Sequence, residues 1–326
     1  MDQETELTMP APKYTDDQFI KVWMDLQSPS KVAEVLGVSL RNINARRVRL
    51  QSKHSIILPC QDGSSPYKMT IPEDKVRIKV DMTNGTFVVF SDAHYFPGLI
   101  STAHRSLLKL LPTIKPKMLI ANGDILDGTS ISSHARIGYE ERPTVQQELE
   151  AVQDRLSELE KACKGGATKF VRTIGNHCIR FDSKLSSFVP QYEKVKGFTL
   201  DDHLPGWTSC WSLMINEDVM VKHRWHSGIH ATHNNILKGG TSFFTGHLHA
   251  LGLARWTDYK GTRYGVDTGT LADPWGSQFG YMEDNPRNWR QGWAMGTIKD
   301  GKLMPPELCE VIDEDHVWWR GEKVKV

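Results

Sequence analysis

Five short apolar segments of the sequence are each followed by residues that can bind a metal. The segments read TFVVF, MLIA, FVRTI, VMVK and FFT, and their length and composition are typical of buried strands. The residues that follow them are Asp92, His94, Asp124, Asn176, His177, His223, His247 and His249. Imidazole and carboxylate groups suit first-row divalent ions, and a shared carboxylate can bridge two ions about 3.5–4 Å apart. These residue types therefore indicate a centre that holds two divalent metal ions.

The elements around these residues predict that they converge. Strands are expected at 77–82, 86–92, 118–124, 169–176, 219–223 and 242–247, and helices at 102–111 and 144–163. In an α/β sheet, ligands collect outside the carboxyl ends of the strands. Glycine before Asp124, Asn176 and His247 lets the backbone approach a metal closely, and His247 and His249 are expected on one face of a strand. Each motif alone is also typical of a polar strand cap, but the whole set in this order predicts one site.

The order of the motifs resembles that of the calcineurin-like metallophosphoesterases, whose pattern runs D-x-H, G-D, G-N-H, H and G-H-x-H. The matching segments are Asp92-Ala93-His94, Gly123-Asp124, Gly175-Asn176-His177, His223 and Gly246-His247-Leu248-His249, within residues 86–273. The resemblance implies an α/β fold, a four-layer α/β/β/α metallophosphoesterase sandwich. It also implies the ligand sets: Asp92, His94 and His249 on one ion, Asn176, His223 and His247 on the other, and Asp124 bridging both.

The resemblance further implies a catalytic role for His177 and for the shared ligand Asp124. Two divalent ions lower the pKa of a water between them, so that hydroxide can attack the phosphate, and His177 is expected to act at the leaving oxygen. Mn²⁺ is the expected ion, with Zn²⁺, Fe²⁺ and Mg²⁺ as alternatives. Many members of the family follow G-N-H with an acidic residue that orients the histidine, where this chain has Cys178. Asp182 and Glu140 are the candidates to replace it.

Other residues near these motifs are candidates for contact with the substrate. Arg224, His226, His230 and His233 follow His223 directly and either line the substrate side of the site or lie on a surface loop. Several tryptophans occur after residue 250, namely Trp256, Trp275, Trp289, Trp293, Trp318 and Trp319. They can stack on unpaired bases, but in a strand-rich segment the core is the favoured place for them.

The sequence before the first motif predicts a separate small domain. We expect a disordered leader at 1–14, a helix-turn-helix domain at 15–54, a linker at 55–75 and the metallophosphoesterase domain at 76–326. Ser28 and Pro29 begin one helix, Gly37 supplies the turn, and Leu40, Ile43 and Val48 are expected to face inward from the next helix. Residues 77–82 and 86–92 then form either a hairpin or a strand that leads into the second domain.

The second helix of this turn carries a basic face that suits DNA. The candidate DNA-binding residues are Arg41, Asn42, Asn44, Arg46, Arg47 and Arg49, with Lys53 nearby. Arginines contact phosphates, and asparagines can read base edges. The alternative is a helical packing or dimerisation module with a solvated basic face.

Composition limits what else the chain can be. It has 326 residues, of which 40 are Lys or Arg and 39 are Asp or Glu, so its net charge of +1 gives no global attraction to nucleic acid or anionic membranes. No apolar run reaches the roughly 18 residues of a membrane span, so we expect no membrane partner and a cytoplasmic location. Its five cysteines are scattered, which argues against a disulfide framework or a cysteine zinc site. The oligomeric state stays open.

Together these features favour a nuclease, in which the helical domain recruits DNA to a metal-dependent phosphodiesterase. Within the family, the arrangement resembles DNA-repair exonucleases or endonucleases and phage-encoded phosphoesterases, including nicking enzymes. The alternative is a phosphatase or cyclic-nucleotide phosphodiesterase whose N-terminal helices bind a partner. A third reading, a DNA-binding regulator with a vestigial metal domain, is disfavoured because the full set of ligand residues is present.

Overall fold

The computed structural model describes residues 14–54, 56, 58, 67–70, 76–134, 142–164, 167–285 and 287–326. The chain divides into two compact units, Met1–Pro66 and Tyr67–Val326. The expected leader, apart from Tyr14, and most of the expected linker lie outside the described residues. Strand β1 (Tyr67–Thr70) falls within the linker range and pairs antiparallel with β2 (Arg77–Met82). The sequence did not reveal β1 because this short segment lies in a stretch with Gly, Ser and Pro, which is typical of a linker.

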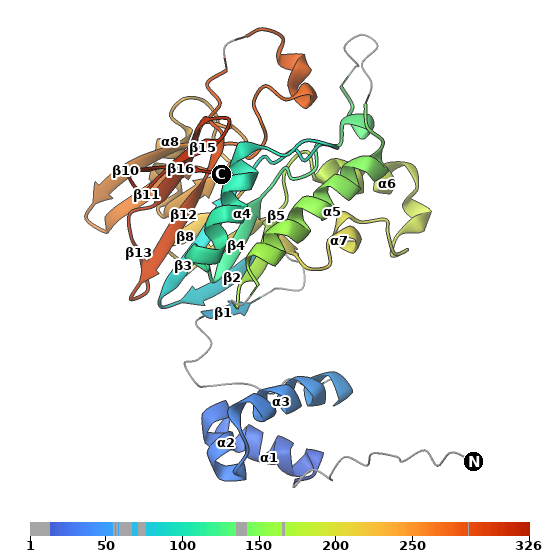
Figure 1. Ribbon diagram of the computed structural model, residues 1–326, viewed down its shortest axis with the longest axis vertical. Coiled ribbons are helices and arrows are strands. Elements are labelled where there is room, and N and C mark those ends of the chain that lie inside the picture. The colour runs from blue at the N-terminus through green and yellow to red at the C-terminus, as the bar shows by residue number, and fades with distance from the viewer. Residues whose placement is uncertain are drawn as a thin grey trace. The chain divides into compact units, whose positions relative to one another are not determined.

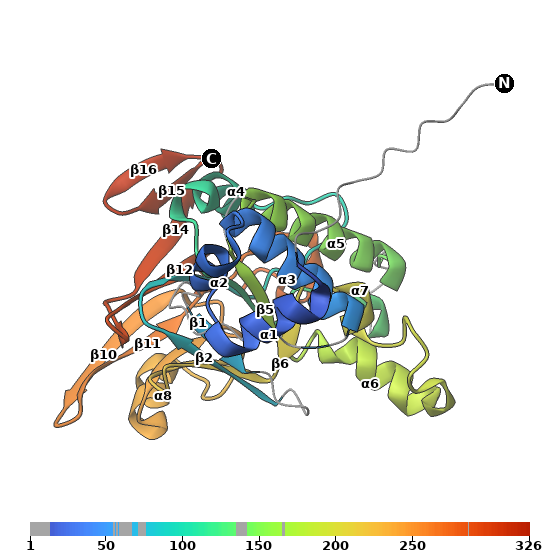
Figure 2. The ribbon, with the colours of Figure 1, turned by 90° about the horizontal axis from the view of Figure 1, so that it is seen from below.

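Three helices form the N-terminal unit (Figures 1 and 2). They are α1 (Asp16–Leu26), α2 (Pro29–Leu36) and α3 (Leu40–His54). Thr15 and Gln18 form a capping box at the start of α1. Ser28 caps the start of α2, and Gly37, with a φ of 61°, caps its end after Leu36. Two helices thus lie on either side of Gly37, and their assignment as a DNA-binding helix-turn-helix stays a prediction.

The buried face of α3 differs in part from the expectation. Ile43 is buried as expected, whereas Leu40 and Val48 are 47% and 65% exposed, and Leu50 is buried instead. At about 100° per residue, Val48 lies about 140° around the helix from Ile43, whereas Leu50 lies only about 20° from it. The buried face therefore follows positions seven residues apart, and Val48 points to solvent.

Two sheets form the centre of the larger unit. Among the described residues, sheet one has the strand order β1-β2-β7-β8-β9-β11-β10, and sheet two has the order β16-β15-β14-β12-β3-β4-β5-β6, with β13 beside β12. The further strands of sheet one are β7 (Ser212–Ile215), β8 (Val219–Val221), β9 (Ser242–Thr245), β10 (Gly252–Asp258) and β11 (Gly261–Asp267). The strands of sheet two are β3 (Gly85–Phe90), β4 (Met118–Asn122), β5 (Lys169–Thr173), β6 (Thr208–Cys210), β12 (Gly292–Lys299), β13 (Lys302–Leu303), β14 (Glu307–Asp313), β15 (His316–Trp319) and β16 (Glu322–Lys325).

Helices cover the outer faces of these sheets. They are α4 (Thr102–Ile114), α5 (Val145–Ala162), α6 (Ile179–Phe188), α7 (Leu200–His203) and α8 (Ala231–Gly239), with short turns η1 (Thr129–Ile131), η2 (Pro190–Tyr192) and η3 (Ser277–Met282). Figure 1 shows α4 and α5 side by side over sheet two, and α8 contacts β9, β10 and β11 of sheet one. The layers therefore run α, β, β, α, which confirms the predicted four-layer sandwich.

Alternating side chains of the central strands explain why the two sheets stack. In β3, Val88 and Phe90 belong to the core beneath α4 and α5, whereas Phe87 and Val89 belong to the core between the sheets. Successive side chains of a strand point to opposite faces, so a strand that is apolar at every position is buried on both. This is why continuous apolar segments precede the candidate ligands.

The strands and helices expected around the ligand motifs are confirmed, and the structure decides between the two arrangements left open for residues 77–92. β2 and β3 do not form a hairpin, because β2 lies in sheet one beside β7 and β3 lies in sheet two beside β4 and β12. Asn84-Gly85 therefore carries the chain from one sheet to the other. The structure therefore supports the other alternative, in which the strand at 77–82 leads into the second domain.

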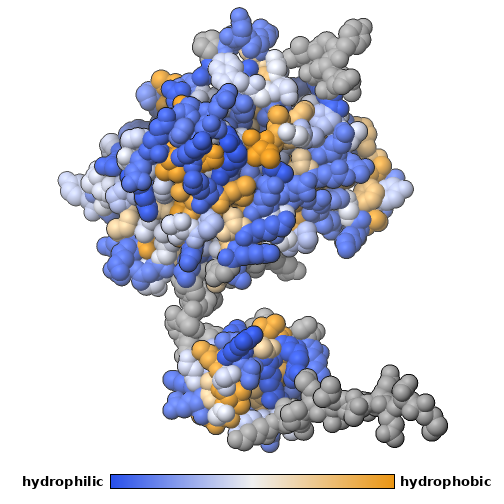
Figure 3. Space-filling view, viewed as in Figure 1, coloured by the Kyte–Doolittle hydropathy of each residue, from blue (hydrophilic) through white to orange (hydrophobic). Residues whose placement is uncertain are grey.

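The described helices include none that is long and apolar enough to cross a membrane. Figure 3 shows that hydrophilic residues predominate on the visible face of the larger unit, with smaller apolar areas among them. Of the described cysteines, Cys163, Cys178, Cys210 and Cys309 are buried free thiols, and Cys60 lies outside the described residues.

Candidate metal centre

The carboxyl ends of strands from both sheets bring the candidate ligands together. Asp92 and His94 follow β3, Asp124 follows β4, and Asn176 follows β5, all in sheet two; His223 follows β8, and His247 and His249 follow β9, in sheet one. Among the described residues, three groups of side chains are close enough to hold a metal ion: Asp92, His94 and His249; His94, Asp127 and His177; and Asp124, His223 and His247. Residues up to 157 positions apart in the sequence, Asp92 and His249, thus meet at one edge of the sandwich.

The first group has the geometry of a cation site. Nε2 of His249 lies 3.1 Å from Oδ1 of Asp92, and Nε2 of His94 lies 4.0 Å from the same oxygen. This oxygen is buried, and no described residue donates a hydrogen bond of acceptable geometry to it. A buried carboxylate oxygen without a donor is costly unless a cation neutralises it. The donor set therefore fits a divalent ion.

The second group is oriented by backbone contacts. His223 hydrogen-bonds through Nδ1 to the carbonyl oxygen of Asn122 at 2.8 Å, so its Nε2 is directed to Asp124 Oδ2 at 3.0 Å and to Asn176 Oδ1 at 3.2 Å. A hydrogen bond at one ring nitrogen fixes which nitrogen faces a metal. His247 joins Asp124 and His223 in this group and is partly exposed. The arrangement suits a second ion, while a bridging role for Asp124 stays a prediction.

The backbone of the candidate ligands is unusual. Five of them have positive φ angles: Asp92 (51°), His94 (37°), Asp124 (47°), His247 (73°) and His249 (59°). This left-handed region is rare for residues other than glycine and costs about 1–3 kcal/mol at each position, so it persists only where the surrounding structure holds it. Strain of this kind collects at functional sites. His247 and His249 consequently lie in a turn beyond β9 rather than on one face of a strand, and they belong to different groups.

Two glycines make room for the carboxylates. A Cβ atom added to Gly175 would lie 2.0 Å from Asp124 Oδ1, and one added to Gly246 would lie 2.5 Å from Asp92 Oδ2. The same oxygens accept backbone hydrogen bonds, from His177 N at 2.7 Å and from His247 N at 2.8 Å. One oxygen of each carboxylate is thus tied to the backbone, which leaves the other for the metal.

Opposite charges lie close together within the site. Burial raises the pKa of Asp92, but the imidazoles of His249 and His223 outweigh it and lower that pKa to about 2. Burial lowers the pKa of His223, but Asp124 and Asp92 outweigh it and raise that pKa to about 9. Ionised carboxylates that draw protons to neighbouring rings can exchange those protons for a metal ion.

Asp127 is a site residue that the motif comparison missed. Its Oδ1 lies 2.8 Å from Nδ1 of His94 and 3.0 Å from Nδ1 of His177. Burial lowers the pKa of His177, but the hydrogen bond to Asp127 and the charge of Asp124 outweigh it, so the net pKa is raised. Asp127 therefore makes the contact with His177 that was expected of Asp182 or Glu140. The available signal was its position, three residues after Asp124 in the segment GDILD.

Of the two residues expected to orient His177, the structure describes only Asp182. Asp182 accepts a hydrogen bond from the amide of Leu200 at 3.0 Å, and Glu140 is outside the described residues. Cys178 is buried, and burial raises the pKa of its thiol. At the opposite ring nitrogen of His177, Nη2 of Arg180 lies 3.3 Å from Nε2.

The candidate substrate residues after His223 are spread out. Arg224 and His230 are exposed, and the charge of Arg224 is one cause, after burial and His223, of the lowered pKa of His247. His226 is half-buried, with its amide bonded to Asn235, and His233 packs against Trp256. Among these residues, Arg224 therefore acts on a candidate ligand, because its charge contributes to the lowered pKa of His247.

The tryptophans divide between core and surface. Trp293 and Trp319 are buried, as favoured from the sequence, whereas Trp256, Trp275 and Trp318 are 37%, 70% and 50% exposed. Trp289 packs against the ring of His249, with centroids 4.4 Å apart. The tail of the chain therefore places one tryptophan directly beside a candidate ligand.

The sequence matches no family model, and it matches no curated protein. Solved structures with a similar fold include Vps29 complexed with Zn²⁺ from Entamoeba histolytica, which is 14% identical, with 74% of this chain and 98% of that chain covered and a TM-score of 0.38. They also include YfcE, a phosphoesterase from E. coli (12% identical, 68% and 97% covered, TM-score 0.31), and a dimetal phosphatase from Danio rerio (10% identical, 69% and 94% covered, TM-score 0.32). We therefore infer the function from the site.

Proposed function

We propose that this chain is a dinuclear metal-dependent phosphodiesterase that acts on DNA, a nuclease. The observation that carries the proposal is the convergence of histidine and carboxylate side chains from five strand ends, most of them on left-handed backbone. A site that holds such strain and buries so many ionised groups supports catalysis better than a purely structural role. Phosphate ester hydrolysis is the reaction class that two ions held by this donor set promote.

The residues of the site have distinct proposed tasks. The residues that would hold the ions are Asp92, His94 and His249 for one, and Asp124, Asn176, His223 and His247 for the other. When bound, two divalent ions would supply an activated water and neutralise the phosphate oxygens; Mn²⁺ is the proposed metal. Burial lowers the pKa of His177, but the hydrogen bond to Asp127 and the charge of Asp124 outweigh it and raise the pKa. Its Nε2 is the nitrogen that we propose protonates the leaving oxygen. Arg180 lies at the same nitrogen and can donate to a phosphate oxygen.

The N-terminal unit supports DNA as the substrate. Arg41, Asn42 and Asn44 are exposed along α3, and the side chain of Arg49 is 64% exposed. An exposed helix face with arginine and asparagine suits contact with phosphates and base edges of duplex DNA. We propose that α3 recruits DNA to the catalytic unit and so raises its local concentration.

One observation favours the alternative, a phosphatase or cyclic-nucleotide phosphodiesterase whose helices bind a partner. Asp16 forms ion pairs with Arg46 at 3.0 Å and Lys53 at 2.8 Å, which reduces the positive charge of α3. Val35, Leu40 and Val48 are also exposed, and exposed apolar side chains suit a protein partner.

Two substrates distinguish these proposals. We expect the metal-loaded protein to cleave both supercoiled plasmid DNA and bis-p-nitrophenyl phosphate, with nicked circles as the product of an endonuclease. Hydrolysis of the chromogenic diester with intact plasmid would favour the alternative. A chelator should abolish both activities, and cleavage that continues in its presence would contradict the metal-dependent mechanism.

A further inference from the structure

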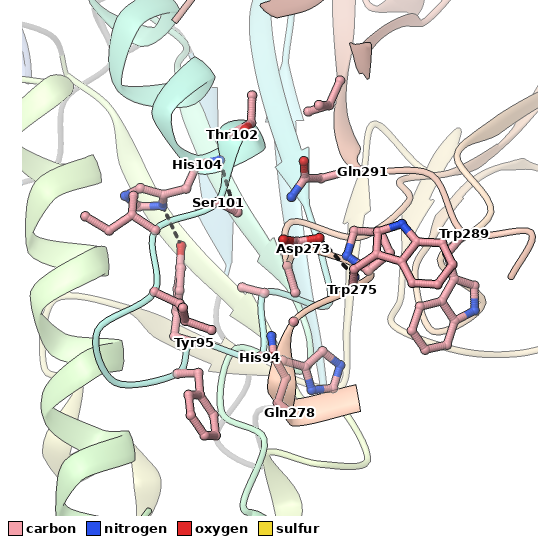
Figure 4. Close-up of a pocket in the computed structure, with 18 of the residues that line it drawn as sticks. His94, Tyr95, Ser101, Thr102, His104, Asp273, Trp275, Gln278, Trp289 and Gln291 are labelled. Carbon is pink, nitrogen blue, oxygen red and sulfur yellow. Dashed lines mark hydrogen bonds between the residues drawn. The ribbon is translucent and has the colours of Figure 1, made fainter. Parts of the chain in front are cut away.

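A cavity of about 790 Å³ adjoins the metal centre. His94, a candidate ligand, forms part of its wall, and the cavity extends from there between α4 and the segment that joins β11 to β12 (Figure 4). This volume is within the range of about 300–1,000 Å³ that is typical of small-molecule sites. A group attached to a phosphate at the metal centre would therefore have a place to bind.

Aromatic rings form the side of the cavity nearest the metal centre. Trp289 lines the cavity and packs on His249, and Trp275 lines it with 70% of its surface exposed (Figure 4). The guanidinium of Arg287 lies over both rings, 5.0 Å from the centroid of Trp275 and 5.3 Å from that of Trp289. One face of Trp275 is therefore covered by Arg287, and its exposure leaves the other face for a ligand.

This aromatic wall is fixed by hydrogen bonds within its own segment. Arg287 donates to the carbonyl oxygens of Pro274 and Phe279, and the amide of Trp275 donates to Asp273 Oδ1 at 2.9 Å. A wall that is already ordered loses little entropy when a flat ligand stacks on it. The segment is thus suited to binding an aromatic group.

The remaining walls distinguish a base from a phosphate. Gln278 and Gln291 present amide groups to the cavity (Figure 4), and amides can both donate to and accept from the edge of a nucleobase. The charged side chains of the lining are acidic in balance: Asp273, Glu310, Asp313 and Glu314 against Arg155 and Arg290. An acidic lining disfavours phosphate groups, so a neutral ring is the part of a nucleotide that fits.

We propose that this cavity binds the base of a nucleotide whose phosphate lies at the metal centre. The inference deepens the proposed function and rests on it. The base stacks on Trp275, and its edge faces the amides of Gln278 and Gln291. A free nucleotide and an unpaired nucleotide of single-stranded DNA offer this same chemistry, and a base of duplex DNA offers it once it is unpaired and unstacked.

Binding to the full-length, metal-free protein tests the inference without catalysis. The probe is etheno-adenosine monophosphate, followed by fluorescence anisotropy, with ribose phosphate as the competitor that lacks a base. We expect the nucleotide to bind and ribose phosphate not to displace it. W275A should weaken binding about tenfold or more, the range of base–aromatic stacking, and W275F should retain most of the affinity. W211A is the matched control, because Trp211 is 44% exposed and lies outside the cavity wall.

Competition identifies the source of the base. A single-stranded oligonucleotide that displaces the probe better than a mononucleotide would assign the cavity to nucleic acid, and the reverse order would assign it to free nucleotides; both support the inference. Equal affinity of the wild type and W275A would overturn it. Stronger displacement by phosphorylcholine would also overturn it, because an aromatic and acidic cavity of this kind can bind a quaternary ammonium.

Steady-state kinetics separate this inference from the proposed function. For the metal-loaded protein, we expect a higher kcat/KM for thymidine p-nitrophenyl phosphate than for bis-p-nitrophenyl phosphate, and W275A should reduce this ratio about tenfold. Hydrolysis of both esters with the same ratio in W275A would contradict the base site alone. Failure to hydrolyse either ester would contradict the proposed function, whatever the anisotropy shows.

Discussion

The candidate binding residues lie in two regions: the metal-binding residues in the metal centre and the basic residues on α3. The two regions differ in how the structure positions these side chains. In the metal centre, buried side chains from separate strand ends converge, and Asp92, Asp124 and Asp127 pair with histidines. On α3, the basic residues lie along one helix, and only some are free for a ligand. Arg46 donates to the Tyr14 carbonyl oxygen and to Asp16, and it lies over the ring of Phe19.

The difference shows how far a charged motif predicts a binding site. The sheet topology fixes the Cα positions of the ligand residues at the strand ends, so their convergence depends little on the conformation of each side chain. A long arginine on a helix can instead turn inward and pack its stem and guanidinium on an aromatic ring. Arg46 and Arg47, which lie over Phe19 and Trp23, do this. Four predictions test the contrast, from the largest expected effect to the smallest.

Substitution of a metal ligand, Asp124 or His249, should have the largest effect on activity. We expect D124N and H249A each to abolish diester hydrolysis, a loss greater than the roughly 10–100-fold typical of groups that only support a ligand. D124N should reduce bound metal more than H249A does, because Asp124 is proposed to contact both ions. Metal analysis after dialysis measures this. Full activity in either variant would contradict the dinuclear centre.

The second prediction concerns His177 and Asp127, which are proposed to act in catalysis without binding a metal ion. H177N should lower kcat about 10²–10⁴-fold, the usual contribution of a proton-transfer group. D127N should lower kcat in the same direction and should shift the pH profile, because the Asp127 hydrogen bond is a main cause of the raised pKa of His177. Asparagine keeps an acceptor oxygen but not the negative charge, so the pKa of His177 should fall, and its protonated form and the rate should be lost at lower pH in D127N.

Asp182 provides the matched control for this pair. It was a candidate from the sequence to orient His177, but it bonds to the Leu200 amide instead, so D182N should leave the pH profile of kcat unshifted. A shift in D182N equal to that in D127N would return the orienting role to Asp182. Metal content should stay near the wild-type value in H177N, and a stripped metal would make His177 a ligand.

The residues at the strand ends were predicted from the sequence because continuous apolar strands and short polar motifs are local signals, whereas the four-layer sandwich was implied by the family that the motifs resemble. It did not predict β1, since that strand is defined by its pairing with β2. It missed Asp127 for a related reason: the carboxylate becomes informative only when two imidazoles from different strand ends meet it. It also placed His247 and His249 on one face of a strand, whereas both have left-handed backbone and follow the end of β9. The different groups to which they belong are those that the family resemblance implied.

The third prediction separates the two kinds of arginine on α3. R41A should weaken duplex DNA binding and reduce the salt-dependence slope by about one, as expected for a lost phosphate contact. R46A should instead destabilise the N-terminal unit, because it removes a bond to the Tyr14 carbonyl and the contact with Phe19. A loss of about 1 kcal/mol lowers the Tm of a small domain by about 4–8 °C.

Fluorescence anisotropy at several salt concentrations and thermal unfolding measure these two variants. N44A is a further test of base contact, since it should lower the preference for a particular sequence without changing the salt slope. If R41A changes neither affinity nor slope, the N-terminal unit does not bind DNA through α3, and the partner-binding alternative is favoured.

The fourth prediction, with the smallest effect, concerns His104, a buried histidine outside the metal centre. Its pKa can be compared with that of His223. His104 Nε2 lies 3.0 Å from Glu158 Oε2, and its Nδ1 lies 3.0 Å from the hydroxyl of Tyr95. Burial outweighs the attraction of Glu158 and lowers the pKa of His104 to about 4, whereas that of His223 is raised to about 9. A neutral imidazole meets both partners, since Nε2–H donates to the carboxylate and Nδ1 accepts from the hydroxyl.

Folding stability should therefore fall with pH between about 6.5 and about 4. In this window the unfolded chain protonates His104 and the folded chain does not, so the unfolded state binds more protons and stability is lost as the pH falls. The expected loss from pH 7 to pH 5.5 is about 1 kcal/mol. Urea unfolding of the metal-free protein measures it, with H104Q as the comparison, because glutamine cannot take up this proton and should give a flatter dependence. Equal slopes in H104Q and the wild type would mean that His104 takes up its proton at the same pH in the folded and unfolded states, and the attraction of Glu158 would then offset the effect of burial.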